Sequence, residues 1–129
     1  MVIVDTDVLV WALRGGPAAA AAADAIERID ARSVSIVTYM ELLQGARNRR
    51  HARAIKDFLI DASLTLLPLT ENIGHRAAVY MEEHALSGGL KMADALIGAT
   101  AVEYNLPLFT GNLRHFRLIA GLDVRVFRP

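Results

Sequence analysis

Short apolar runs alternate along the chain with longer stretches in which apolar residues recur at helical spacing. The short runs predict five β-strands: Val2–Val4, Ser33–Val37, Leu64–Leu67, Pro107–Thr110 and Val124–Phe127. The longer stretches predict helices from Pro17 through the alanine run to Ala25, from about Thr38, over Arg50–Asp61, from the N-cap Thr70 to about Leu86, and over Met92–Tyr104. Because strands alternate with helices, the pattern predicts an α/β fold, a parallel sheet of about five strands covered on both faces.

Composition narrows the class of protein. The 129 residues suit one domain, residues 1–129, and 53% of them are hydrophobic, which is ample for a core. No apolar run reaches the ~18 residues of a membrane span, and no basic segment precedes the apolar N-terminus, so we expect neither a membrane anchor nor a secretory signal. The chain has no cysteine. This excludes disulfides and thiolate metal sites and fits a cytoplasmic protein.

The net charge of zero gives no general attraction to nucleic acid, but the charges are unevenly spread. Six basic residues fall within ten positions: Arg47, Arg49, Arg50, His51, Arg53 and Lys56. On a helix that begins near Arg49, the side chains of Arg49, Arg53 and Lys56 share one face. This face could contact RNA phosphates or a protein partner, or it could simply be solvated.

Polar side chains with metal-binding oxygens follow several of the predicted strands. Asp5 and Asp7 come directly after the first strand, Glu41 lies four residues beyond the second, and Asn112 follows the fourth. Asp94 falls in the first turn of a predicted helix. Sites in open parallel sheets lie beyond the carboxyl ends of the strands, at the switch point of strand order. We therefore expect Asp5, Glu41 and Asn112 at one edge, joined by Asp94 if its helix starts there.

Most of these residues also have a purely structural interpretation. Thr38-x-x-Glu41 matches a capping box, in which the Glu41 side chain returns to the Thr38 amide. Asp94 could complement a helix dipole, and Asn112 could be an ordinary turn residue. Asp5 is harder to explain in this way, because a carboxylate at the end of a buried strand needs a partner or a cation.

Converging carboxylates point to one kind of chemistry. Without a cation they repel one another, and at least one stays protonated. Oxygen ligands suit Mg²⁺ or Mn²⁺, whereas zinc is a poor fit because the four histidines show no paired spacing. The chain has no P-loop and neither a G-x-G-x-x-G nor a G-x-S-x-G motif. What remains is a carboxylate-bound divalent cation, whose natural chemistry is phosphoryl transfer with a metal-activated water.

Four segments together resemble the PIN-domain ribonucleases of the VapC toxin type. They read MVIVDTDVLVWAL, TYMELLQGAR, ADALIGATAVEYNLPLFTGNLRHF and GLDVRVF, and with their spacing they cover nearly the whole chain. The resemblance implies a three-layer α/β/α fold with a central parallel sheet. It also implies an endoribonuclease that uses Mg²⁺ or Mn²⁺ to cleave RNA, forms a homodimer and is silenced by a small antitoxin protein.

The same resemblance assigns roles to individual residues. The three acidic positions of the family fall on Asp5, Glu41 and Asp94, which we expect to hold the metal. The fourth catalytic position, often aspartate in PIN domains, is Asn112, whose neutral amide is a poorer ligand and weakens a second metal site. Asp7 lies near the site, where it could hold a water or Thr6 in place, and we do not expect it to be a ligand.

Three other classes of protein share some of these features. A haloacid-dehalogenase-like phosphatase uses a strand-end D-x-D such as Asp5-Thr6-Asp7 and a later lysine, for which Lys91 could serve, but the acidic pair that should follow is missing. A receiver domain needs an aspartate after its third strand, where Pro68 stands. A non-catalytic PIN-fold binding module has no need of three costly acids.

Overall fold

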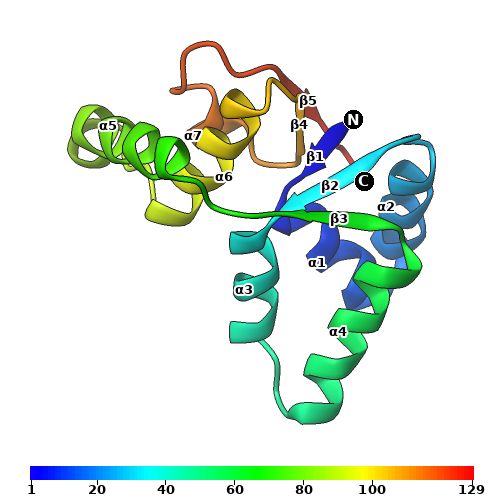
Figure 1. The fold of residues 1–129 in the computed structure, drawn as a ribbon. Coiled ribbons are helices and arrows are strands. Elements are labelled where there is room, and N and C mark those ends of the chain that lie inside the picture. The colour runs from blue at the N-terminus through cyan, green and yellow to red at the C-terminus, as the bar shows by residue number, and fades with distance from the viewer.

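The computed structural model describes all 129 residues and contains one five-stranded sheet, all parallel, with the strand order β3-β2-β1-β4-β5 (Figure 1). The strands are β1 Val2–Val4, β2 Arg32–Ser35, β3 Leu64–Leu67, β4 Leu108–Thr110 and β5 Val124–Val126. The helices are α1 Thr6–Arg14, α2 Pro17–Glu27, α3 Ile36–Gln44, α4 Arg49–Asp61, α5 Glu71–Gly88, α6 Met92–Glu103 and α7 Leu113–Phe116. The predicted α/β class and the parallel sheet are confirmed.

Helices cover both faces of the sheet and give the predicted three layers. Consecutive strand residues point to opposite faces, so the buried Ile3 belongs to one core cluster and the buried Val4 to the other. The first cluster joins the sheet to α5, α6 and α7, and the second joins it to α1, α2 and α4, as the two groups of helices in Figure 1 show. No helix is long and apolar enough to cross a membrane.

Two helices, α1 and α7, were absent from the sequence prediction. Helix α1 begins directly after β1, with Asp5 as its N-cap: the Asp5 carboxylate accepts a hydrogen bond of 2.8 Å from the Thr6 amide. The strand therefore ends on an acid partly because a helix starts there, a structural role that the sequence analysis missed. Helix α7 has only four residues, which is too short for a clear periodic signal.

The predicted boundary between β2 and α3 was wrong by two residues. The strand ends at Ser35, whose hydroxyl accepts a hydrogen bond from the Val37 amide and so caps α3. Thr38 is fully buried inside the helix, which excludes the capping-box interpretation of Thr38 and Glu41. The β-branched Ile36 and Val37 favoured a strand, but they form the first turn of the helix because Ser35 supplies the cap.

Other helix ends follow the prediction closely. Pro17 occupies the first turn of α2, and Thr70 caps α5 by accepting a hydrogen bond from the Ile73 amide. Gly89 ends α5 in the left-handed conformation, with φ of 70°, which glycine adopts without steric cost.

The strand order places a switch point between β1 and β4. From β1 the chain moves outward to β2 and β3, and it then returns to the other side of β1 to form β4 and β5. The segments that follow β1 and β4 therefore leave the sheet side by side, and a crevice between them is the expected position of a functional site.

Candidate active site

A cavity of about 360 Å³ lies beyond the carboxyl ends of β1 and β4. Its walls include all four residues that we predicted for the site: Asp5, Glu41, Asp94 and Asn112. They come from the end of β1, from α3, from the first turn of α6 and from the segment after β4. Residues 107 positions apart in the sequence thus meet at the switch point, together with Asp7.

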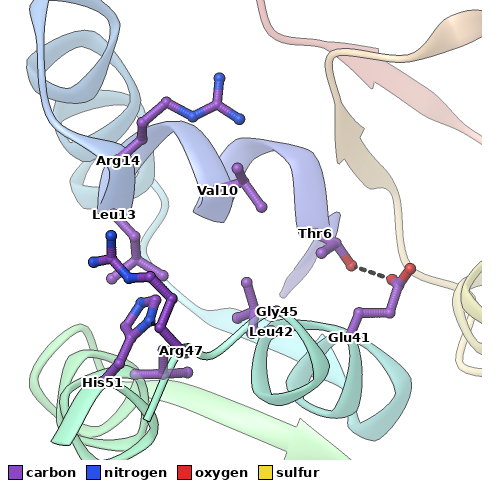
Figure 2. Close-up of a pocket in the computed structure, with 10 residues that line it drawn as sticks. Thr6, Val10, Leu13, Arg14, Glu41, Leu42, Gly45, Arg47 and His51 are labelled. Carbon is purple, nitrogen blue, oxygen red and sulfur yellow. Dashed lines mark hydrogen bonds between the residues drawn. The ribbon is translucent and has the colours of Figure 1, made fainter.

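Glu41 reaches the cavity from α3 and is held there by Thr6, the first residue of α1. Thr6 Oγ1 donates to Glu41 Oε1 at 2.7 Å, as Figure 2 shows, and lies 3.0 Å from Thr38 Oγ1. The two threonines link the starts of α1 and α3 and fix one oxygen of Glu41. The side chain therefore serves the cavity and not the cap of its own helix.

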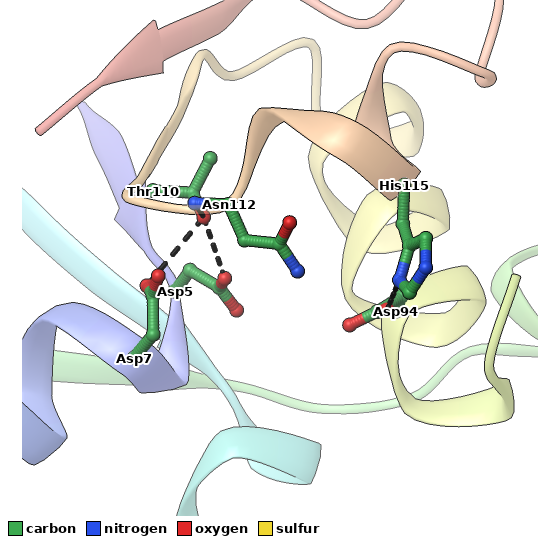
Figure 3. Close-up of polar contacts among 6 residues, drawn as sticks. All are labelled: Asp5, Asp7, Asp94, Thr110, Asn112 and His115. Atoms are coloured by element: carbon green, nitrogen blue, oxygen red, sulfur yellow. Dashed lines mark hydrogen bonds and ion pairs between the residues drawn. The ribbon is translucent and has the colours of Figure 1, made fainter.

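Asp5 is the most buried acid of the site, with 5% of its surface exposed. One carboxylate oxygen accepts the Thr6 amide, and the other accepts the hydroxyl of Thr110 at 2.7 Å (Figure 3). Burial, followed by the negative charge of Asp7, raises the pKa of Asp5 to about 8, while its two hydrogen bonds oppose the rise. Asp5 is thus a buried acid without a full counterion in the protein.

Asp7 lies at the cavity as predicted, but it does not hold Thr6. Its carboxylate accepts the backbone N–H of Gly111 at 3.0 Å, makes a long contact of 3.5 Å with Thr110, and makes no hydrogen bond with Thr6. Burial also raises its pKa. Asp7 ties the start of α1 to the segment after β4 and so fixes the two sides of the switch point against each other.

Asp94 faces the cavity from α6 but is paired with a residue whose role the sequence left open. Its carboxylate lies 2.9 Å from Nδ1 of His115, and Figure 3 shows that the His115 imidazole reaches the Asp94 carboxylate from α7. Both side chains are largely buried, with 19% and 16% of their surfaces exposed. His115 therefore contacts one of the two Asp94 oxygens that could bind a cation.

Asn112 lies between the two groups of acids in Figure 3. Its backbone N–H donates to Thr110 Oγ1 at 2.9 Å, and its carboxamide makes no hydrogen bond within the protein although it precedes α7. The amide is free to contact something in the cavity, which distinguishes Asn112 from an ordinary turn or capping residue.

The side chains fit a divalent cation by their chemistry but not by their present arrangement. Each of the four predicted residues offers an oxygen ligand, which suits Mg²⁺ or Mn²⁺, and a cation would favour the charged form of Asp5, whose pKa burial raises. Yet no three acidic or histidine side chains stand close enough to hold one ion. Thr6 contacts one oxygen of Glu41 and His115 one oxygen of Asp94, so each acid keeps a second oxygen for a cation, and binding requires the side chains to move closer together.

The structure also places the predicted basic residues and reveals others. Arg49, Arg53 and Lys56 are exposed on α4, and none of them lines this cavity. Sequence reasoning missed three residues that hold the acids, Thr6, Thr110 and His115, and it also missed Arg14, which lines the cavity without contacting an acid. Their only signal was position, since Thr6 stands between two acids and Thr110 ends a strand that leads to Asn112.

Comparison with known proteins identifies the family. Residues 2–122 match the PIN domain family. The chain is 35% identical to Ribonuclease VapC19 of Mycobacterium tuberculosis, in an alignment that covers 95% of this chain and 98% of that protein. It is 32% identical to Ribonuclease VapC10 of the same species, in an alignment that covers 95% of this chain and 90% of that protein.

A toxin–antitoxin complex from Klebsiella pneumoniae contains a chain with a similar fold. The TM-score is 0.76, the identity is 26%, and the similarity covers 95% of each chain. These findings exclude the phosphatase and receiver-domain alternatives, whose folds and motifs differ from those matched. From its fold, the position of its acids and these similarities, the chain belongs to the PIN domain family, among the VapC-type ribonucleases.

Proposed function

We propose that this protein is a divalent-metal-dependent endoribonuclease, the toxin of a toxin–antitoxin pair, that acts on RNA in the cytoplasm. The observation that carries the proposal is that Asp5, Glu41, Asp94 and Asn112, from four separate segments, line one cavity at the switch point of the sheet. The similarity to two ribonucleases over 95% of the chain supports the same reaction.

Each acid has a separate role in this proposal. Asp5 and Asp94 hold the cation, which we take to be Mg²⁺ or Mn²⁺, and Glu41 completes the set or orients the attacking water. When bound, the cation neutralises the buried acids and acts as a Lewis acid on the scissile phosphate. Thr6 keeps one Glu41 oxygen fixed, so the other is left to accept a hydrogen bond from water.

The protein chain also prepares the cavity for the substrate. Thr110 fixes Asp5, and Asp7 holds the segment that carries Asn112 against α1. The free carboxamide of Asn112 is placed to donate to a phosphate oxygen, which a carboxylate at this position would repel. Preorganised donors of this kind stabilise charge that develops in the transition state.

Two protein partners belong to the proposal. One is a small antitoxin, because the Klebsiella pneumoniae structure with the similar fold is a toxin–antitoxin complex. The other is a second copy of this chain, since apolar side chains remain exposed at the ends of α5 and α6. The exposed Arg49, Arg53 and Lys56 are available to RNA or to the antitoxin.

The test is cleavage of RNA by the purified protein with Mg²⁺ or Mn²⁺ and then with EDTA. We expect cleavage that EDTA abolishes, and a loss of roughly 100-fold or more in Asp94→Asn, because the cation loses a charged ligand. The control is Asp24→Asn, the same change at an exposed position of α2, which should cleave like the wild type. Equal cleavage in EDTA contradicts the proposal. No cleavage under any condition favours the non-catalytic binding module.

A further inference from the structure

A second cavity, of about 430 Å³, continues from the candidate active site along α1. Four residues line both cavities: Thr6, Val10, Arg14 and Glu41. The hydrogen bond between Thr6 and Glu41 appears at one end of the second cavity in Figure 2. Its other end lies beside Arg14, the last residue of α1. Arg14 follows Thr6 by eight positions along the helix, a rise of about 12 Å. The cavity is therefore an extension of the active site and not an isolated hollow.

The walls of this cavity are apolar and its far end is positively charged. Apolar side chains from α1, α3 and α4, among them Val10, Leu42 and Ile55, line it. Arg14 and Arg47 lie toward the end that is remote from Glu41, as Figure 2 shows. Neither arginine forms a salt bridge with an acid of the protein, so both guanidinium groups are free to bind an anion.

His51 adds a hydrogen-bond donor at the same end. Its Nδ1 accepts the backbone N–H of Arg47 at 3.1 Å. In the neutral ring the proton is therefore on Nε2, which can donate to a ligand. The three groups at this end thus offer donors only, while the single acid, Glu41, stands at the opposite end.

We infer that this cavity binds one nucleotide of the RNA next to the scissile bond, with the base against the apolar wall and its phosphate on Arg14 and Arg47. The inference rests on the proposed function. Single-stranded RNA is recognised largely through unstacked bases inserted into protein surfaces, and arginine suits phosphate by its forked geometry. The volume is that of a small-molecule site. A chain of alternating bases and phosphates can span both cavities, which an isolated anion cannot.

The first test is the Michaelis constant for a short single-stranded RNA cleaved in the presence of Mn²⁺. In Arg47→Ala we expect KM to rise roughly tenfold with kcat within about twofold, because this arginine contacts substrate away from the reacting atoms. Arg28→Ala is the matched control. Arg28 is exposed, caps the C-terminal end of α2 and lies before β2, near the amino ends of the strands, whereas the active site lies beyond their carboxyl ends. Its KM should equal that of the wild type.

The second test detects the base separately from the phosphate. Binding of RNAs with a single abasic position is measured without metal on the inactive Asp94→Asn protein. Removal of the base at one RNA position, beside the mapped cleavage site, should lower the affinity for the protein roughly tenfold. In Leu13→Trp, whose larger side chain should fill the cavity, removal of that base should leave the affinity unchanged. Arg47→Ala should lower the slope of log K against log salt by about 0.7, the value of one phosphate contact.

The outcomes separate this inference from the proposed function. Absence of metal-dependent cleavage in the wild type removes the proposed function and this inference with it. Normal wild-type cleavage with an unchanged KM in Arg47→Ala, or equal losses at every abasic position, overturns this inference alone. If Arg47→Ala binds RNA as tightly as the wild type and loses affinity only for an acidic peptide, the cavity is a protein-docking site and the inference is likewise wrong.

Discussion

The buried carboxyl group of Asp5 gives the protein a definite pH dependence. Its pKa rises from the ordinary 3.8 to about 8 on folding, chiefly through burial. Between these two values the folded protein keeps a proton that the unfolded chain has lost. The free energy of unfolding of the metal-free protein therefore falls as the pH rises from about 4 to 8, since stability falls with pH wherever the folded state binds more protons.

Asp5→Asn should remove most of this dependence. The amide stays neutral at every pH, so the variant should be more stable than the metal-free wild type at pH 8, by on the order of a few kcal/mol, and should match it near pH 4. Denaturant unfolding at the two pH values measures the difference. Added Mn²⁺ should stabilise only the wild type. A steep fall in stability that persists in Asp5→Asn would contradict this account.

Substitution of Asn112 tests whether an additional negative charge at this position strengthens cation binding. In Asn112→Asp a charged oxygen replaces a neutral one, and we predict Mn²⁺ binding about tenfold tighter, which corresponds to ~1.4 kcal/mol. Calorimetric titration measures the affinity, with Asn105→Asp, the same change at an exposed position after α6, as the control. Unchanged or weaker binding would remove Asn112 from the metal site.

At the scale of elements, the site depends on how closely the segment after β4 approaches α1. Gly111 donates its N–H to Asp7, and a Cβ atom added to this glycine would lie 2.7 Å from Trp11 Cζ3 and 2.9 Å from Asp7 Oδ2. Real side chains do not approach this closely, so glycine is needed here for space. The glycine therefore permits the contact that holds Asn112 over the cavity.

Gly111→Ala should therefore lower both stability and activity. We expect a loss of about 1–3 kcal/mol in the free energy of unfolding, because Trp11 and Asp7 must move. Gly74→Ala is the control: it lies on the exposed face of α5 with open space around it, and it should gain up to ~1 kcal/mol from helix propensity. Chemical denaturation compares the two. Equal stability of both variants would show that the close approach is not needed.

At the scale of the molecule, the two-sided sheet buries its apolar residues well but leaves some at one extremity. Leu86 is fully exposed near the end of α5, Met92 at the start of α6 is 70% exposed, and Val79 shares the face of Leu86 two turns earlier on α5. Clustered apolar residues on a surface are typical of contacts between proteins. They form a candidate surface for the second copy of the chain.

We predict a dimer by light scattering at micromolar concentration. Leu86→Glu combined with Met92→Glu should give a monomer, because charges at the centre of an apolar contact are left without partners. Ile60→Glu, at an exposed apolar position on α4, should remain dimeric. A monomeric wild type would refute the dimer, and a dimeric double variant would move the contact to another surface.

The sequence by itself determined the architecture and the positions of the acids. Runs of β-branched residues and helical periodicity are local signals, and their alternation requires a parallel sheet. Once the sheet is parallel, Asp5 and Asn112 must leave it at the same edge, because both follow strands. The same signals failed at Ile36 and Val37, whose strand propensity was overridden by the cap at Ser35, and at α1, which starts without a linker after β1.

Only the tertiary structure decided which partner each acid takes. Hydrogen bonds between Thr6 and Glu41, and between His115 and Asp94, join residues 35 and 21 positions apart, and no local pattern specifies them. The same holds for the second cavity, whose cations Arg14 and Arg47 come from different elements. Local sequence sets the period and the ends of an element, whereas the environment of a side chain depends on packing between elements that are distant in the chain.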